Sequence, residues 1–275
     1  METIFGLWYR DAIKFFRDKF TIFSSFALPF LFLVVFGTGM GGAIESLLIG
    51  ANASQELSEF NFVQFMFPGI IAMAVFTTTM FAGYSLIEDR KAGYLKEVLV
   101  SPAPRVLVAI GKILGCATTA LLQGIMMLIF VPFIGLSLNA ELVVKLVLAI
   151  LLASFTLSAV SILLASFLKS IQGFQTIVQM VLYPLFFLSG AFFPLSGIPK
   201  WMEIIVKINP MTYIVDFLKR IVFDVDKLNP ILKQVMGMNL EVLNHKVTSI
   251  DELILLVALG IIFTIITAIS FSKVD

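Results

Sequence analysis

Long apolar segments, separated by short charged ones, dominate this sequence. Six of them reach the length of about 20 residues that a helix needs to cross the hydrocarbon core of a bilayer: 22–42, 63–87, 106–134, 143–168, 174–193 and 253–272. The charged residues inside them are Lys112 and Lys145, each near a segment end, where we expect the amine to reach the interface. The pattern predicts an all-α polytopic membrane protein with six transmembrane helices, in a single domain over residues 1–275.

Basic residues alternate between the segments that connect the predicted spans. Because cytoplasmic loops carry an excess of Lys and Arg, we expect a multi-pass protein of the cytoplasmic inner membrane with both termini in the cytoplasm. The segment 194–252 is also basic although this topology puts it outside, but long segments count little in this rule. Lys and Arg occur in 1–21, in 88–105, at Lys169 and at Lys273, whereas 43–62 and 135–142 contain none.

The first 21 residues predict an amphipathic helix that lies in the cytoplasmic interface. An apolar run at 22–36 resembles the core of a cleaved signal peptide, but the flank before it is long and contains Asp11 and Asp18, which disfavours cleavage. The expected apolar face consists of Phe5, Trp8, Ala12, Phe15 and Phe16, opposite Arg10, Lys14 and Arg17.

The loop after the second predicted span carries both charge and an apolar stripe. Charged residues 88–91 end the span, and Gly93 permits a sharp turn. Residues 94–100 can then form a short helix with Leu95 and Leu99 on one side. Two interpretations remain open: a solvated hairpin between spans, or a short cytoplasmic helix that docks into a partner protein.

Two short helices are predicted in the long segment between the fifth and sixth spans. Pro199 suits the start of the first, and Asn209 followed by Pro210 provides an N-cap and first position for the second. Both are too short and too charged to cross a membrane, so we expect them to be re-entrant or interfacial on the outer side, with Trp201 and Tyr213 as interfacial rings. The two helices are expected at 199–207 and 210–222.

Composition narrows the class further. Hydrophobic residues make up 59% and charged residues 13%, about half the charge of a typical soluble domain. A net charge of +1 gives no reason to expect nucleic acid as a partner. Cys116 is the single cysteine and His245 the single histidine, which excludes an internal disulfide and disfavours zinc or histidine-based catalysis. No nucleotide-binding P-loop motif is present. We therefore expect no catalytic, metal or cofactor site in this chain.

Three motifs, taken in order along the chain, resemble those of one transporter family. The chain is similar to the permease subunits of type-2 ABC exporters, in particular those of the daunorubicin-resistance type, over nearly its whole length. The likeness implies half of an exporter that moves an amphipathic or hydrophobic substrate such as a drug, lipid or glycan-lipid. The motifs are Phe67-Pro68-Gly69-Ile70, the stretch from Asp89 to Leu95 with Ser101-Pro102, and Asn209-Pro210-Met211-Thr212-Tyr213 with Asp216.

The resemblance also implies partners and roles for particular residues. Two copies of an ABC ATPase (nucleotide-binding) subunit would bind ATP and Mg, and a second permease chain, identical or homologous, would complete the complex in contact with membrane lipid. Residues that would couple to the ATPase are Glu88, Asp89, Arg90, Gly93, Tyr94, Leu95, Lys96 and Leu99. The second and fifth spans would line the substrate path with Phe76, Thr77, Met80, Gln175, Gln179 and Tyr183. The outer lid would include Pro199, Trp201, Asn209, Pro210, Tyr213 and Asp216.

Two functions of other classes remain as alternatives. One is a passive channel or facilitator, which rings of charge or carbonyl-lined breaks would favour. The other is a membrane protein of structural or assembly function with no transport path. The sequence shows neither charge rings nor ionisable residues in mid-membrane, which also argues against a proton-coupled carrier. From the mild polarity of the spans we expect an uncharged, amphipathic or apolar-bodied substrate.

Overall fold

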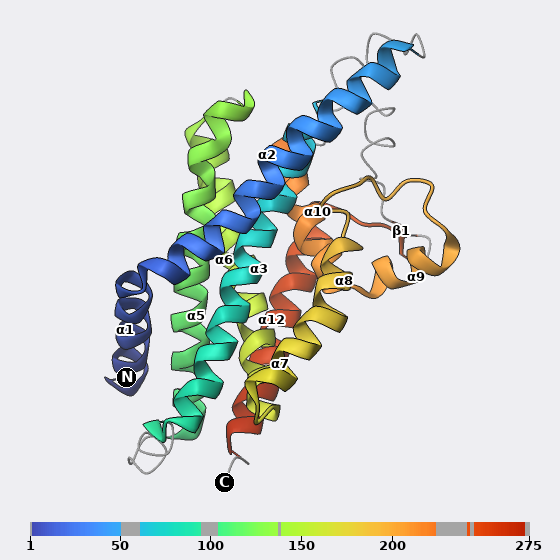
Figure 1. Ribbon diagram of the computed structural model, residues 1–275. Helices are drawn as coiled ribbons and strands as arrows, with labels where there is room; N and C mark the ends of the chain where they lie inside the picture. The colour runs from blue at the N-terminus through green and yellow to red at the C-terminus, as the bar shows by residue number, and fades with distance from the viewer. Residues whose placement is uncertain are drawn as a thin grey trace.

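The computed structural model describes residues 2–50, 61–94, 104–136, 139–223, 241–242 and 245–272. These residues are almost entirely helical (Figure 1). The helices are α1 (Glu2–Arg17), α2 (Lys19–Gly50), α3 (Phe62–Lys91), α5 (Arg105–Met127), the 3₁₀ helix η1 (Leu128–Ile134), α6 (Ala140–Phe167), α7 (Ile171–Ile177), the π-helix η2 (Val178–Leu182), α8 (Tyr183–Phe187), α9 (Lys200–Ile208), α10 (Pro210–Phe223) and α12 (Ser249–Ser272). Two short antiparallel strands, β1 (Glu241–Val242) and β2 (His245–Lys246), precede α12.

Five helices in the described part of the chain are long and apolar enough to cross a membrane. They coincide, to within a few residues at each end, with the first, second, third, fourth and sixth predicted spans. The prediction of a multi-pass membrane protein is therefore confirmed at this level. The five are Ile22–Ala43 within α2, then α3, the continuous Arg105–Ile134 of α5 and η1, α6, and α12.

The fifth predicted span, 174–193, is wrong at its carboxyl end. The apolar helix there covers Ile171–Phe187 and contains the π-helical turn η2. The chain then turns back at Gly190, whose φ of +79° favours glycine. Ala191 packs so closely on α3 that a Cβ at Gly69 would lie 2.5 Å from its carbonyl oxygen. Residues 188–193 are thus apolar because they are buried within the protein, which hydropathy alone cannot distinguish from lipid contact.

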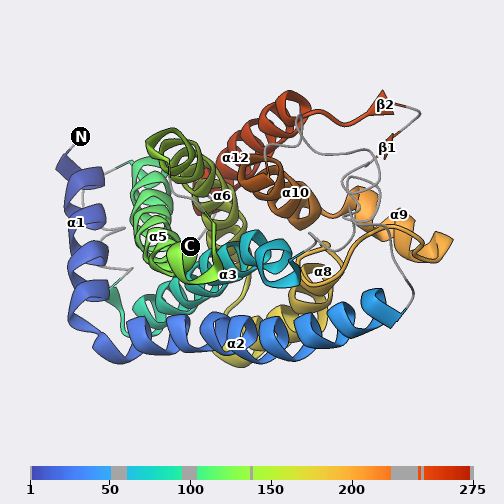
Figure 2. The same cartoon turned by 90° about the horizontal axis from the view of Figure 1, so that it is seen from above.

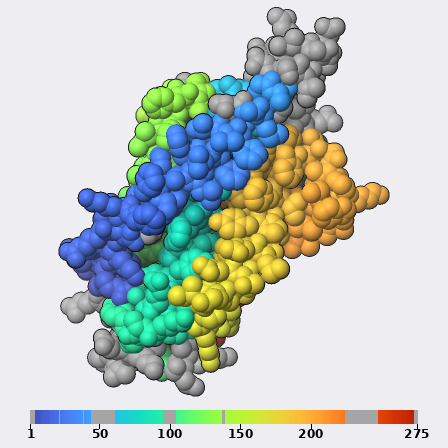
Figure 3. Space-filling model, viewed as in Figure 1, coloured from blue at the N-terminus to red at the C-terminus, as the bar shows by residue number. Residues whose placement is uncertain are grey.

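α3 is the central helix of the bundle, with α2, α5, α6 and α10 packed around it (Figures 1 and 2). It is apolar on all sides, which is the pattern of a helix buried within a protein. Phe65, Phe67 and Phe76 on it are almost completely buried. α2 and α12 instead leave much of their apolar surface exposed, as helices in contact with lipid do. The space-filling view shows α2 crossing the face of α3, with α7 beside them (Figure 3).

α1 runs along one edge of the bundle, beside α5, in the view from above (Figure 2). It rests on α5 at two glycines: a Cβ at Gly111 would lie 3.2 Å from the Leu7 Cβ, and one at Gly115 would lie 3.0 Å from the Asp11 Cβ. The small-residue spacing of α5 therefore serves close contact with α1. Contact with the bundle buries Leu7 and Phe15, whereas Phe5 and Phe16 of the predicted apolar face are exposed, where an interfacial helix would meet the membrane.

The two predicted short helices are present as α9 and α10. The Asn209 side chain accepts a hydrogen bond from the Met211 amide at 3.0 Å, so it caps α10 as expected. Its amide nitrogen also donates to the Leu185 carbonyl at 2.6 Å, which ties α10 to α8. The N-terminal helix and the end of α12 lie toward the same end of the bundle as the end of α3 (Figure 1).

Candidate functional site

A cluster of charges, buried at Lys112 and exposed at Lys14, joins α1 to the end of α3 and the first part of α5. Lys112 of α5 donates to Asp89 of α3 at 2.8 Å and to Asp11 of α1 at 3.1 Å. Arg10 of α1 donates to both carboxylates, to Asp11 at 2.8 Å and to Asp89. Lys14 adds a longer contact of 3.8 Å to Asp89 and a hydrogen bond of 2.7 Å to the Ser85 hydroxyl. We call Arg10, Asp11, Lys14, Asp89 and Lys112 the ion cluster.

The expectation that Lys112 extends to the membrane interface is wrong. Its side chain is only 4% exposed, and its amine lies between two carboxylates of other helices. A buried charge costs several kcal/mol unless it is paired and hydrogen-bonded, and Asp11 and Asp89 provide both. Gly115 allows this pairing, because the absence of a side chain there lets Asp11 approach α5 closely enough to contact Lys112.

Arg10 remains charged in this setting. Burial alone would lower the pKa of its guanidinium, but hydrogen bonds to Asp89 and Asp11 raise the pKa above its ordinary value. The guanidinium also lies 4.0 Å from the centre of the Tyr94 ring, a cation–π contact. Tyr94 is the last described residue before 95–103, so the ion cluster reaches the start of that segment.

The predicted coupling residues fall into two groups. Asp89 belongs to the ion cluster, and Arg90 donates to the Ser166 and Leu168 carbonyls at the end of α6, so contacts within this chain hold both side chains. Glu88 is exposed, and Gly93 turns the chain with a φ of +83°, in agreement with the prediction of a sharp turn. Leu95, Lys96 and Leu99 lie outside the described residues.

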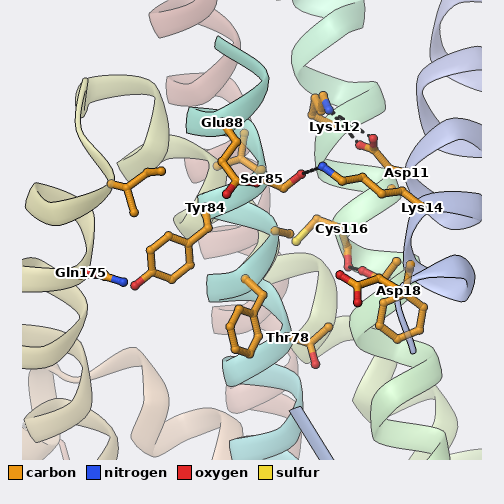
Figure 4. Close-up of a pocket in the computed structure, with 17 residues that line it drawn as sticks. Asp11, Lys14, Asp18, Thr78, Tyr84, Ser85, Glu88, Lys112, Cys116 and Gln175 are labelled. Atoms are coloured by element: carbon orange, nitrogen blue, oxygen red, sulfur yellow. Dashed lines mark hydrogen bonds and ion pairs between the residues drawn. The ribbon is translucent and has the colours of Figure 1, made fainter. Parts of the chain in front are cut away.

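A cavity of about 440 Å³ lies beside the ion cluster, between α1, α3, α5, α6 and α7 (Figure 4). Asp11, Lys14 and Lys112 of the cluster line one wall. Asp18, Ser85, Glu88, Thr119, Cys116 and Gln175 add polar groups, and Phe15, Thr78, Phe81, Ala82, Tyr84, Gly115, Ile162 and Ile171 complete the lining. The Tyr84 hydroxyl faces the Gln175 amide across it (Figure 4). This volume suits a drug-sized molecule.

Of the predicted path residues, Gln175 lines this cavity and the other five do not. Phe76, Thr77 and Met80 of α3 are buried. The Phe76 ring packs edge-on against Tyr183 at 5.6 Å, which brings the second and fifth predicted spans into contact. Gln179 is exposed on η2.

One predicted lid residue, Asp216, belongs to a second group of buried charges. Asp216 pairs with Arg220 at 2.9 Å, and Arg220 lies 3.3 Å from the fully buried Glu252 of α12. Lys219 is buried, donates to the Gly190 carbonyl at 2.5 Å and lies 3.5 Å above the Phe65 ring. Burial lowers the pKa of Lys219 to about 7, although Asp216 opposes this.

The remaining lid residues differ in exposure, and Tyr213, expected as an interfacial ring, is buried within the protein. Pro199 is the residue before α9, and Trp201 is exposed. The Tyr213 hydroxyl donates to the Lys207 carbonyl at 2.6 Å and so joins α10 to α9.

Sequence reasoning missed the pairing of Asp11 with Lys112 and of Glu252 with Arg220. The available signal was Lys112 itself, since a charge within a predicted apolar span calls for a partner of opposite charge. For Lys219 and Glu252 no local pattern indicated burial, because both stand beside other charged residues. Among the residues that the structure describes, no group of three or more His, Cys, Asp and Glu side chains is placed to hold a metal ion.

Comparison with known proteins decides the family. The profile of the ABC-2 type transporter family matches residues 2–223, which include both charge groups apart from Glu252. The chain belongs to this family. It is therefore a transport permease of the type-2 ABC class, as the resemblance predicted, and a multi-pass membrane protein.

Three curated relatives illustrate the range of the family. A putative transport permease, ycf38, of Cyanophora paradoxa is 28% identical over 219 residues, covering 78% of this chain and 72% of its own length. The inner membrane transport permease YadH of Escherichia coli K12 is 25% identical over 216 residues, covering 76% of this chain and 78% of its own length. The daunorubicin resistance ABC transporter permease protein DrrB1 of Streptomyces coeruleorubidus is 27% identical over 217 residues, covering 77% of this chain and 71% of its own length.

Proposed function

We propose that this permease is the membrane half of an ATP-driven exporter, which moves an amphipathic or hydrophobic substrate across the cytoplasmic membrane. The observation that carries the proposal is the ion cluster, which fastens α1 to α3 and α5 at the end where the segment 95–103 leaves α3. A force applied to α1 or to that segment is passed to two membrane helices together, because buried ion pairs resist separation.

Energy comes from a separate ATPase subunit in this proposal, and the permease itself binds neither ATP nor Mg. Two ATPase copies bind two permease chains, identical or homologous, arranged about a two-fold axis. The segment 95–103 and α1 contact the ATPase, with Leu95 and Leu99 as apolar anchors and Lys96 at the rim. Closure of the ATPases then shifts the spans as rigid bodies, and the lid of α9 and α10 opens outward.

Co-expression tests the proposal against its two alternatives. The chain is produced with candidate ATPases that carry a P-loop motif, beginning with any encoded next to it, and purified in a mild detergent. We expect one ATPase to co-purify in equal amount and its ATP hydrolysis to depend on the permease. Ion or solute flux through the chain alone in liposomes would support a passive channel instead. Absence of both flux and an ATPase partner would support a structural or assembly protein.

A further inference from the structure

We infer that the cavity beside the ion cluster binds an amphipathic molecule with one positive charge. It receives the cationic head at Glu88 and the apolar body between Phe81, Phe15 and Ile162. The inference rests on the proposed function only in treating this molecule as the substrate. It revises the expectation of an uncharged substrate, because charged side chains line this cavity in addition to the mildly polar residues of the spans.

The wall that α3 presents to the cavity changes from apolar to charged along the helix. Thr78, Phe81, Ser85 and Glu88 all line the cavity and recur at steps of three and four residues, so they share one face. Ten residues of helix span about 15 Å, which separates an apolar region near Thr78 from the carboxylate of Glu88 near the helix end. An amphiphile with its head toward the end of α3 and its body toward the bilayer centre matches this gradient.

The charges of the lining favour a cation. Its ionisable residues are Asp11, Asp18, Glu88, Lys14 and Lys112, three acidic and two basic, which gives a formal charge of −1. Both lysines direct their amines to the ion cluster, Lys112 to Asp11 and Asp89 and Lys14 to Ser85 with Asp89 nearby. Neither amine is therefore available to an anionic ligand without loss of these contacts.

Glu88 is the carboxylate best placed to meet a ligand. It is exposed and forms no ion pair within 4.0 Å with any residue in the part of the chain that the structure describes. Its carboxylate is directed toward Ser85 and Tyr84 in the close-up (Figure 4). A carboxylate accepts a strong charge-assisted hydrogen bond from an ammonium group.

Aromatic side chains supply the second element of cation recognition. Phe15, Phe81 and Tyr84 come from two different helices and all line the cavity. Ring faces attract cations, and they do so most strongly where water is excluded. Ile162 of α6 and Ile171 of α7 add aliphatic surface for the body of the molecule. A carboxylate, three aromatic rings and two aliphatic side chains thus line one cavity, which suits a lipophilic cation.

Two probe ions of nearly identical shape and opposite charge test the inference. Tetraphenylphosphonium and tetraphenylborate are titrated into the purified permease in an uncharged detergent, without ATPase or nucleotide, and binding is measured by calorimetry. We expect the phosphonium to bind at least roughly tenfold more tightly than the borate, a difference of about 1.4 kcal/mol. Equal binding of the two ions would overturn the inference.

Variants then locate the charge that is responsible. Glu88→Gln is expected to weaken phosphonium binding by roughly tenfold, and Glu88→Lys to reverse the preference between the two ions. Glu141→Gln is the matched control, since Glu141 is an exposed carboxylate on α6 that does not line the cavity. A thermal unfolding curve shows that each variant is folded. Unchanged phosphonium affinity in folded Glu88→Gln would assign the binding elsewhere and contradict the inference.

The design separates this inference from the proposed function. Loss of cation preference with an intact ATPase partner would remove the ligand assignment and leave the exporter proposal standing. Cation binding without any ATPase partner would leave a lipophilic-cation site in a protein that is not an ATP-driven exporter.

Discussion

Lys112 shows how a single buried charge determines helix packing in this permease. Its amine bridges carboxylates from α1 and α3, and the three helices meet at this point. In the apolar environment of a helix bundle each of these charges is tolerated only because the others are present. Removal of Lys112 therefore leaves two largely buried carboxylates without their shared partner.

Lys112→Met is expected to destabilise the folded permease by about 3–5 kcal/mol, because Asp11 and Asp89 lose their shared partner. The matched control is Lys145→Met, which removes an exposed lysine paired with Glu141 and should cost no more than about 1 kcal/mol. Unfolding in detergent, followed by circular dichroism, measures both. Equal effects of the two substitutions would show that the ion cluster does not hold the helices together.

Lys219 is expected to make the stability of the permease depend on pH. Burial lowers its pKa from 10.5 to about 7 in the folded protein. Between pH 7 and pH 10.5 the unfolded chain carries a proton on Lys219 that the folded protein lacks, so stability rises with pH. Below about pH 7 the amine is protonated in both states, and stability no longer changes with pH through this group. Unfolding midpoints between pH 6.5 and 9.5 should rise in the wild type and lose part of this slope in Lys219→Met. An identical slope in both proteins would contradict burial of the charged amine.

At the scale of elements, the helices differ in how they are held. α3 is buried along most of its length, whereas α1 is held by the ion cluster and by close contact at Gly111 and Gly115. α10 combines buried apolar residues with the Asp216 ion pair and the Asn209 cap. Because the ion pairs fasten α1 to α3 and α5, we expect these three helices to move together in a transport cycle.

Asn209→Ala is expected to loosen α10 specifically. The substitution removes the cap on the Met211 amide and the bond to Leu185, and a lost cap costs about 0.5–2 kcal/mol. Amide hydrogen exchange in α10 should become faster while α3 is unaffected. Asn139→Ala serves as the control, since Asn139 precedes α6 without a side-chain capping bond. Faster exchange in α3 but not in α10 would show that Asn209 supports the bundle and not the lid.

At the scale of the whole molecule, topology follows from the distribution of basic residues. We expect the end of α3 to be cytoplasmic and the start of α6 to be outside. An impermeant thiol reagent on intact cells should label Asn139→Cys and leave Lys91→Cys unlabelled until the membrane is opened. The native Cys116 is buried and contributes little background. Labelling of Lys91→Cys in intact cells would invert the topology.

The sequence carried enough information for most of the fold. Five spans were predicted within a few residues because length and hydropathy suffice for helices that cross a bilayer. The fifth failed because residues 188–193 are apolar through burial against α3 near Gly69, a tertiary contact that a hydropathy pattern does not contain. Caps such as Asn209 were predictable because they are local.

The candidate site was less predictable. Asp11 and Lys112 stand 101 residues apart, and nothing local indicates that α1 lies on α5. The cavity likewise depends on side chains from five helices, so its charge could not be derived from any single span. Glu88 was selected from the sequence as a coupling residue, and only the structure shows that it lines a cavity.

The central claim is that the segment after α3 transmits ATP-driven force to the ion cluster and the membrane helices. The most direct test measures ATP hydrolysis by the partner ATPase, reconstituted with the permease in liposomes. Leu95→Asp with Leu99→Asp should abolish ATPase binding and permease-dependent hydrolysis, because unpaired charges in a desolvated groove cost several kcal/mol, whereas Leu95→Met with Leu99→Met should preserve both. Wild-type hydrolysis and binding in the aspartate double variant would show that this segment is a solvated hairpin and would contradict the account.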